Sequence, residues 1–194
     1  MSTMRVGRRR IGVASIVLAA ALSAAPAIAE GGVTVGVSDV AADVAVKAAF
    51  LYNFAKFTEW PALPPGGPLV LCVVGGDAVA AALVETVKGQ NISGRALEVW
   101  RPQESSSWRS CHLLFIADAE MRKSTGGLAG IKTLPVLTVS DSKDFSQTGG
   151  IIELFVESGR MRFAINMDAA EGSGLRLSSR LLGLAKVTRN GHGP

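Results

Sequence analysis

The residues in this chain with the clearest capacity for chemistry are Cys72 and Cys111, together with His112, which directly follows the second cysteine. A cysteine and a histidine in contact could act as a nucleophile and its base. Each cysteine, however, lies in or beside an apolar run typical of a strand, where neighbouring side chains point to opposite faces. An even number of cysteines favours a disulfide if the chain is exported, for which the N-terminal residues give evidence below, and two buried free thiols are the alternative. A Cys72–Cys111 bridge would close a loop of about 40 residues and stabilise the fold by roughly 3–4 kcal/mol.

Three other groups of polar residues deserve a chemical interpretation. The turn Gly75-Gly76-Asp77 could receive an anion at a helix N-terminus, but Asp77 would repel a phosphate and is expected to cap the helix instead. Arg176 and Arg180 are spaced so that a helix would place them on the same face. There they either face solvent or bind an anion between them. Four carboxylates follow predicted strands, where α/β proteins tend to place ligands, or are simply solvated loop residues: Asp118, Glu120, Asp141 and Asp144.

Motifs of the common enzyme classes are absent from the sequence. There is no phosphate-binding G-x-x-x-x-G-K-[ST] loop, no G-x-G-x-x-G fingerprint and no G-x-S-x-G elbow. The two histidines, His112 and His192, are too far apart in the chain to suggest a metal site by themselves. A hydrolase would have only the serines at 105–107 and His112 to support it. The sequence therefore predicts no catalytic residue, no metal site and no cofactor.

Aromatic residues gather in one predicted helix. Five of the eleven aromatic residues of the chain lie there, namely Phe50, Tyr52, Phe54, Phe57 and Trp60. Their wide apolar face is compatible with ordinary core packing against a sheet. Aromatic side chains also supply the anchors of protein interfaces, so a dimer or partner surface is the second interpretation.

The elements that must position these residues alternate between helical and strand patterns. Helices are expected at 43–60, ended by Pro61, and at 78–87, 120–131 and 168–186; in the last, Leu177, Leu181 and Leu184 are expected to face inward. Strands are expected at 69–74, 95–101, 112–117, 134–140, 151–156 and 160–165. The short connection Glu157-Ser158-Gly159 predicts an antiparallel hairpin. The pattern indicates a single-domain three-layer α/β sandwich, with a mixed, mostly parallel sheet, a C-terminal antiparallel hairpin and flanking helices.

The N-terminal residues predict export. Four arginines precede an apolar run from Ile11 to Leu22, and Ala27-Ile28-Ala29 provides a small-x-small cleavage site, which is typical of a secretory signal peptide. We expect a signal peptide at 1–29, a flexible lead at 30–41, a domain at 42–188 and a disordered tail at 189–194. The apolar run is shorter than the ~20 residues of a membrane span, so no stable membrane insertion is expected.

Charge argues against nucleic acid as a partner. The chain has 20 basic and 16 acidic residues, but four of the basic ones and none of the acidic ones precede Glu30. The mature chain would therefore carry equal numbers of each. A nucleic-acid binder needs a basic surface to displace counterions from phosphates, and the mature composition does not offer one.

Five segments of the sequence resemble the YfiR family of periplasmic regulators. They are the run KAAFLYNFAKFTEWP at 47–61, CHLLFI at 111–116, GGII at 149–152, FAIN at 163–166 and GLRLSSRLL at 174–182. The similarity extends in the right order from about Val44 to Val187.

The resemblance implies a periplasmic α/β sandwich that forms homodimers and has no enzymatic activity. It implies a regulator that binds and represses the periplasmic sensor region of a membrane diguanylate cyclase of the YfiN type, which limits cyclic-di-GMP signalling and biofilm formation. It also implies redox tuning: Cys72 and Cys111 match a family pair, while a second pair that some members carry near 141–153 is absent here. The alternative is a periplasmic small-ligand-binding sensor coupled to another membrane signalling protein, such as a histidine kinase.

The expected partner surface combines the aromatic helix with the region from Asn166 to Arg180. Its candidate residues are Phe54, Phe57, Trp60, Asn166, Leu175, Arg176 and Arg180.

Overall fold

A computed structural model describes residues 37–61, 63 and 66–189. The predicted signal peptide at 1–29 lies outside the described residues, as do residues 30–36 of the predicted lead and residues 190–194 of the predicted tail. Residues 37–41 of that lead belong to the first helix, α1 (Val37–Lys56), which therefore begins six residues before the predicted start. Alanines at 41 and 42 are strong helix formers and continue the helical pattern toward the N-terminus.

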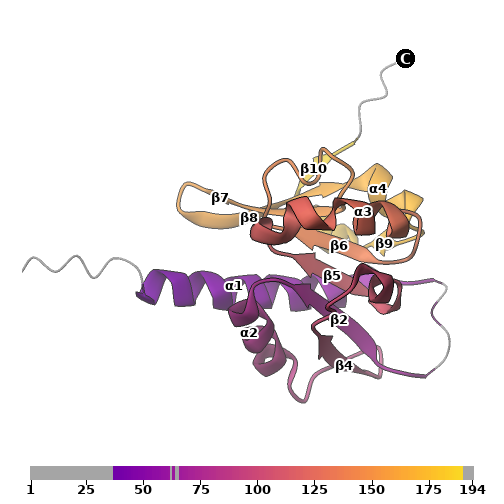
Figure 1. The fold of residues 1–194 in the computed structure, drawn as a ribbon, viewed down its shortest axis with the longest axis horizontal. Helices are drawn as coiled ribbons and strands as arrows, with labels where there is room; N and C mark the ends of the chain where they lie inside the picture. Colours follow the sequence, from indigo (N-terminus) through magenta and orange to yellow (C-terminus); the bar gives the residue numbers. More distant parts are fainter. Residues whose placement is uncertain (1–36, 62, 64–65, 190–194) are drawn as a thin grey trace, which may run out of the picture. The chain divides into compact units, whose positions relative to one another are not determined.

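The centre of the described chain is an eight-stranded mixed sheet, drawn in Figure 1. Its strand order is β10-β8-β7-β6-β5-β2-β4-β3. The strands are β2 (Leu69–Val74), β3 (Asn91–Ile92), β4 (Arg95–Trp100), β5 (Leu113–Ile116), β6 (Leu137–Ser140), β7 (Ile152–Glu157), β8 (Arg160–Asn166) and β10 (Lys186–Thr188). Parallel pairing runs from β4 through β2, β5 and β6 to β7, while β7 and β8 form the predicted antiparallel hairpin. The predicted fold class is confirmed.

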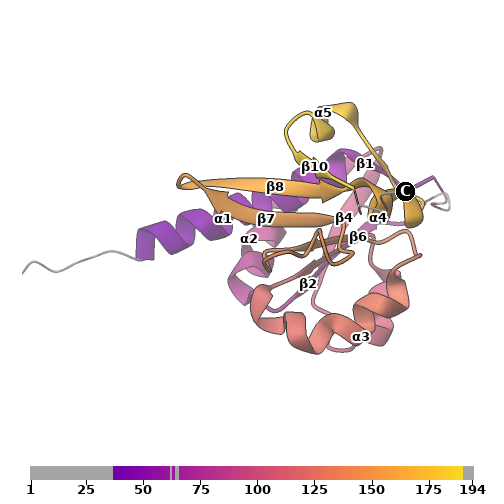
Figure 2. The same ribbon diagram turned by 90° about the horizontal axis from the view of Figure 1, so that it is seen from above.

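Helices cover both faces of this sheet, which makes the fold a three-layer sandwich (Figures 1 and 2). In β5, Leu113 and Phe115 face a core that also contains Leu51 of α1 and Leu83 of α2 (Asp77–Val87). The alternate residues Leu114 and Ile116 face a second core with residues of η1 (Ser105–Ser110) and α3 (Met121–Ile131). A strand buried on both faces explains the continuous apolar run in the sequence.

The aromatic helix ends earlier than Pro61 because the chain turns into a short strand. Thr58 donates a hydrogen bond from its hydroxyl to the carbonyl of Phe54, at 2.7 Å, and this closes the last turn. Residues Thr58–Glu59 form β1, which pairs antiparallel with β9 (Arg176–Leu177) in a separate two-stranded sheet. Pairing with a distant segment overrides the local helical pattern.

The predicted long helix at 168–186 is wrong. The chain instead forms α4 (Met167–Gly172), β9, α5 (Ser179–Leu182) and then β10. Gly174 adopts φ +69°, a left-handed conformation that ends a helix and that favours glycine. The hydroxyl of Ser178 accepts from the backbone N–H of Leu181, so a new helix begins there.

Three smaller expectations also change. Gly76, at φ 66°, occupies the N-cap position of α2, and Asp77 is the first helical residue, where its carboxylate forms an ion pair with Arg101. The segment between the strands predicted at 95–101 and 112–117, for which no helix or strand was expected, contains the 3₁₀ helix η1. The strand predicted at 134–140 is shorter, because regular pairing begins only at Leu137.

Candidate functional site

A groove of about 260 Å³ lies between the C-terminal half of α1 and the segment around α5. It is lined by Phe50, Asn53, Phe54, Phe57, Phe163, Arg180, Leu181 and Leu184. Phe163 belongs to β8, on the sheet face that α1 covers. The groove therefore joins two of the regions that the sequence placed on one candidate surface.

The base of the groove is a cluster of three phenylalanine rings. The Phe54 and Phe163 ring centroids are 5.0 Å apart, and Phe50 lies 5.6 Å from each of them. Phe54 is fully buried. The three rings therefore form a packed base, with the tilted and edge-to-face contacts that aromatic side chains prefer.

Backbone contacts hold the wall around α5 against the end of α1. The antiparallel β1–β9 pair places Thr58 beside Leu177 and Glu59 beside Arg176. The backbone N–H of Ser178 donates to the carbonyl of Phe57 at 3.0 Å. The groove wall thus depends on pairing between residues more than 110 positions apart in the sequence.

Positive charges surround the half-buried ring of Phe57. The Arg180 guanidinium lies 5.8 Å from the ring centroid, and the Lys56 ammonium lies 6.0 Å from it. Arg180, Lys56 and Arg176 are all exposed. An aromatic base with a cationic rim suits a protein segment that has an apolar anchor beside acidic residues.

The structure divides the seven predicted surface residues into two groups. Phe57 is partly accessible, and Arg176 and Arg180 are exposed. The other four side chains, Phe54, Trp60, Asn166 and Leu175, are all buried. Of these four, only Phe54 lines the groove, and none of them offers an exposed side chain to a partner.

Two of the buried residues have specific structural contacts. The Trp60 ring packs edge-on against His112, with centroids 6.1 Å apart. The Asn166 side chain accepts from the N–H of Ala169 at the start of α4 and donates to the carbonyl of Ser146 at 2.6 Å. Cap and core residues of this kind cannot be distinguished from surface anchors by residue type alone.

Three exposed residues of this site were not among the sequence candidates. Leu184, expected to face inward, is 70 % exposed, and Asn53 and Lys56 are exposed on α1. Asn53 and Lys56 were detectable in principle, because they are polar positions within the aromatic run. Leu184 was not, because its exposure depends on α5 ending at Leu182.

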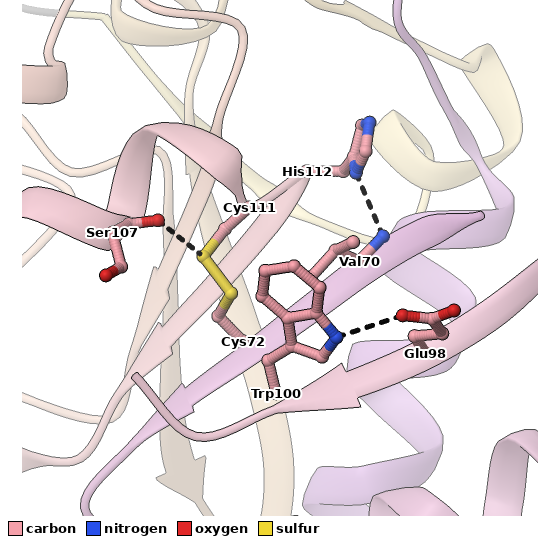
Figure 3. The surroundings of a disulfide bond; sticks show 7 residues. All are labelled: Val70, Cys72, Glu98, Trp100, Ser107, Cys111 and His112. Carbon is pink, nitrogen blue, oxygen red and sulfur yellow. Dashed lines mark hydrogen bonds between the residues drawn. A yellow bond between two sulfur atoms is a disulfide. The ribbon is translucent and has the colours of Figure 1, made fainter. Parts of the chain in front are cut away.

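The predicted disulfide is present between Cys72 and Cys111, whose Cα atoms are 5.8 Å apart (Figure 3). Cys72 lies in β2, and Cys111 lies between η1 and β5, so the bond fastens η1 to the sheet. The register of β2 and β4 places Trp100 beside Cys72, and Figure 3 shows the Trp100 indole next to the sulfur atoms. The Trp100 Nε1–H donates to the Glu98 carboxylate at 3.0 Å.

His112 has a structural role beside this disulfide. Its Nδ1 accepts a hydrogen bond from the backbone N–H of Val70 at 2.9 Å, which ties β5 to β2 (Figure 3). Burial lowers the pKa of His112 below its usual 6.5, and the positive charge of Arg95 lowers it further. The imidazole is therefore neutral near pH 7, and the Cys111 sulfur next to it is committed to the disulfide.

The predicted carboxylate cluster is largely engaged in local contacts. Asp141 accepts from the Lys47 ammonium at 2.8 Å and from the backbone N–H of Asp118 at 2.8 Å. Burial lowers the pKa of Lys47, but its bonds and charge interactions with Asp141 and Asp43 outweigh this and raise it overall. Glu120 pairs with Lys123. Within residues 37–61, 63 and 66–189, no group of three or more potential ligands is placed to hold a metal ion.

The protein is a three-layer α/β domain that carries one disulfide and an aromatic surface groove. Among its described residues we recognise no set of catalytic side chains. Residues 44–186 match the YfiR/HmsC-like family model, so the chain belongs to that family. A comparison with curated proteins found no match. Across the described part of the chain, no helix combines the length and apolar character needed to cross a bilayer.

Proposed function

We propose that this protein is a periplasmic, non-enzymatic regulator that binds and represses the periplasmic sensor domain of a membrane diguanylate cyclase. Its action would limit cyclic-di-GMP signalling and biofilm formation. Membership of the YfiR/HmsC-like family over residues 44–186 is the observation that carries this proposal. Repression would follow if the regulator binds the inactive state of the sensor more tightly than the active state.

The aromatic groove is the surface that we assign to this partner. Its base is already packed, so the protein should lose little conformational freedom when a partner side chain enters. Leu184 and Arg180 flank the opening, and both are accessible in the described chain. We also propose that the regulator acts as a homodimer, which light scattering of the purified mature protein will test.

Two substitutions test the groove without disturbing its buried base. Arg180→Glu reverses a rim charge, and Leu184→Asp places a carboxylate at the exposed apolar edge. Arg122→Glu is the matched control, because Arg122 is exposed on α3, on the other side of the sheet. We expect both groove variants to release repression in the native host and the control to retain it, with unchanged melting temperatures for all three.

Capture from native membranes identifies the partner. A photo-crosslinking residue at position 184 should capture one membrane protein with a periplasmic sensor and a cytoplasmic cyclase domain, while a crosslinker at exposed position 125 should not. Capture of a sensor kinase would redirect the output to phosphotransfer. Unchanged cyclic-di-GMP after deletion of the gene would refute the cyclase proposal.

A further inference from the structure

A second hollow lies on the opposite side of the sheet from the aromatic groove. It has a volume of about 460 Å³ and lies between α3 and the loop at 141–150. Thr138 of β6 and Ile151 form part of its lining, together with Met121, Leu128 and Ile131 of the helix and Phe145 of the loop. This volume lies within the range of ordinary small-molecule sites.

The loop side of this cavity is built before any ligand arrives. Glu153 is 8 % exposed, and its carboxylate accepts from the backbone N–H groups of Asp144 and Ser146, each at 3.1 Å. The Ser146 hydroxyl donates to the same carboxylate at 2.7 Å. Phe145 lies between these anchored residues and packs directly on Gly150, where an added Cβ would overlap its ring. A wall held in this way does not need to be ordered by binding.

Polar groups inside the cavity are already satisfied by the protein. The Thr138 hydroxyl oxygen accepts from the backbone N–H of Ile151 at 3.1 Å. The Ser173 hydroxyl donates to the carbonyl of Lys132 at 3.0 Å. The remaining lining is mainly aliphatic and aromatic, so the body of a fitting ligand must be apolar.

One charge stands at the edge of this apolar space. Lys132 follows the last residue of α3, and its ammonium lies beside Gly149, where an added Cβ would be 4.0 Å from Nζ. Among the residues that the structure describes, no carboxylate lies within ion-pair distance of Lys132. An unneutralised cation at the rim of an apolar cavity is complementary to an anionic head group on an apolar body.

We propose that this cavity binds a small amphipathic anion, namely a carboxylate carried on a single alkyl chain or aromatic ring. Lys132 binds the carboxylate, and the apolar body lies between α3 and Phe145. The site shares no lining residue with the aromatic groove. It stands whether or not the groove binds a cyclase.

Methyl NMR of the purified mature protein tests the assignment with two anions, decanoate and phenylacetate, and with neutral decanol. Met121, Ile131 and Ile151 report on the cavity, while Ile92 in β3 and Met161 in β8 report on remote positions. We expect at least one anion to shift the three cavity signals and to leave the remote ones in place. Decanol should bind more weakly than decanoate.

Lys132→Gln separates the charge from the apolar cavity. It should weaken binding of the anion by about tenfold, the scale of one hydrogen bond to a charged group, without changing decanol binding. Lys123→Gln, which removes an exposed charge from the same helix, is the matched control and should bind like the wild type. The proposal is overturned if neither anion shifts the cavity signals, if only remote signals move, or if Lys132→Gln binds the anion as tightly as Lys123→Gln does.

Discussion

Two segments cover the same face of the sheet beside α3, and they are fastened by different chemistry. The segment at 101–111, which contains η1, is joined to β2 by the Cys72–Cys111 disulfide. The loop at 141–150 is held by the Glu153 carboxylate through three hydrogen bonds. One attachment is covalent and depends on redox conditions, whereas the other is polar and does not.

This difference changes what the missing second cysteine pair means. The resemblance to the YfiR family raised the possibility of a redox-sensitive link near 141–153, yet the chain has no cysteine there. Glu153 provides a non-covalent link in that region. A reductant should therefore loosen the η1 side of α3 and leave the loop side intact.

The largest effect is expected from removal of the disulfide. The two cysteines are separated by 39 positions in the sequence, and the double substitution Cys72→Ala with Cys111→Ala opens the loop that they close. It should lower the free energy of unfolding by about 4 kcal/mol. Denaturant unfolding of the wild type with and without reductant measures the same quantity. Reduction should also change the emission of Trp100, which lies beside the bond. Equal stabilities for oxidised and reduced protein would contradict the prediction.

A smaller loss is expected from Glu153→Gln. The substitution keeps the size of the side chain but replaces one acceptor oxygen with an NH₂ donor, so at least one of the three donors loses its partner. We expect a loss of about 2 kcal/mol in the free energy of unfolding, typical of a buried polar group left unsatisfied. Glu157→Gln is the control, because Glu157 is exposed at the end of the same strand.

A combined variant tests whether the two attachments are independent. If they are, the losses from Glu153→Gln and from the disulfide substitution should add to within about 0.5 kcal/mol. A coupling well above that value would mean that α3 transmits strain from one segment to the other, so that the two attachments are not independent.

Much of the sheet could be predicted because its strands carry local signals. The apolar runs at β2 and β5 and the short turn between β7 and β8 reproduce the observed elements closely. The C-terminal region could not be predicted in the same way. Its residues have helical composition, but its backbone conformation depends on Gly174 and on pairing with β1, which lies more than 110 residues away.

The candidate site shows the same division between local and distant causes. The disulfide followed from counting cysteines and placing them beside strands, and Phe57 followed from the aromatic spacing. Leu184 and Lys132 could not be identified from the sequence, because their roles depend on tertiary placement. Leu184 lies at the edge of the aromatic groove, and Lys132 lies at the edge of the cavity beside α3. The burial of Phe54, Asn166 and Leu175 likewise depends on which elements happen to cover them.

The smallest expected effect is a pH dependence at His112, close to the covalent attachment. Burial and Arg95 lower the pKa of His112 in the folded state below 6.5. As the pH falls through the region just below 6.5, the unfolded chain binds a proton before the folded chain does, so stability decreases. Below the folded-state pKa, both states are protonated and this contribution stops changing.

Denaturant unfolding across this pH range will detect the effect as a difference between the wild type and His112→Gln. The wild type should lose more stability on acidification, because a proton on Nδ1 removes the acceptor for the Val70 N–H. This hydrogen bond joins β2 to β5 without involving the sulfur of Cys111. The difference should therefore persist in the disulfide-free variant. Identical pH profiles for the wild type and His112→Gln would show that this hydrogen bond does not couple protonation to folding.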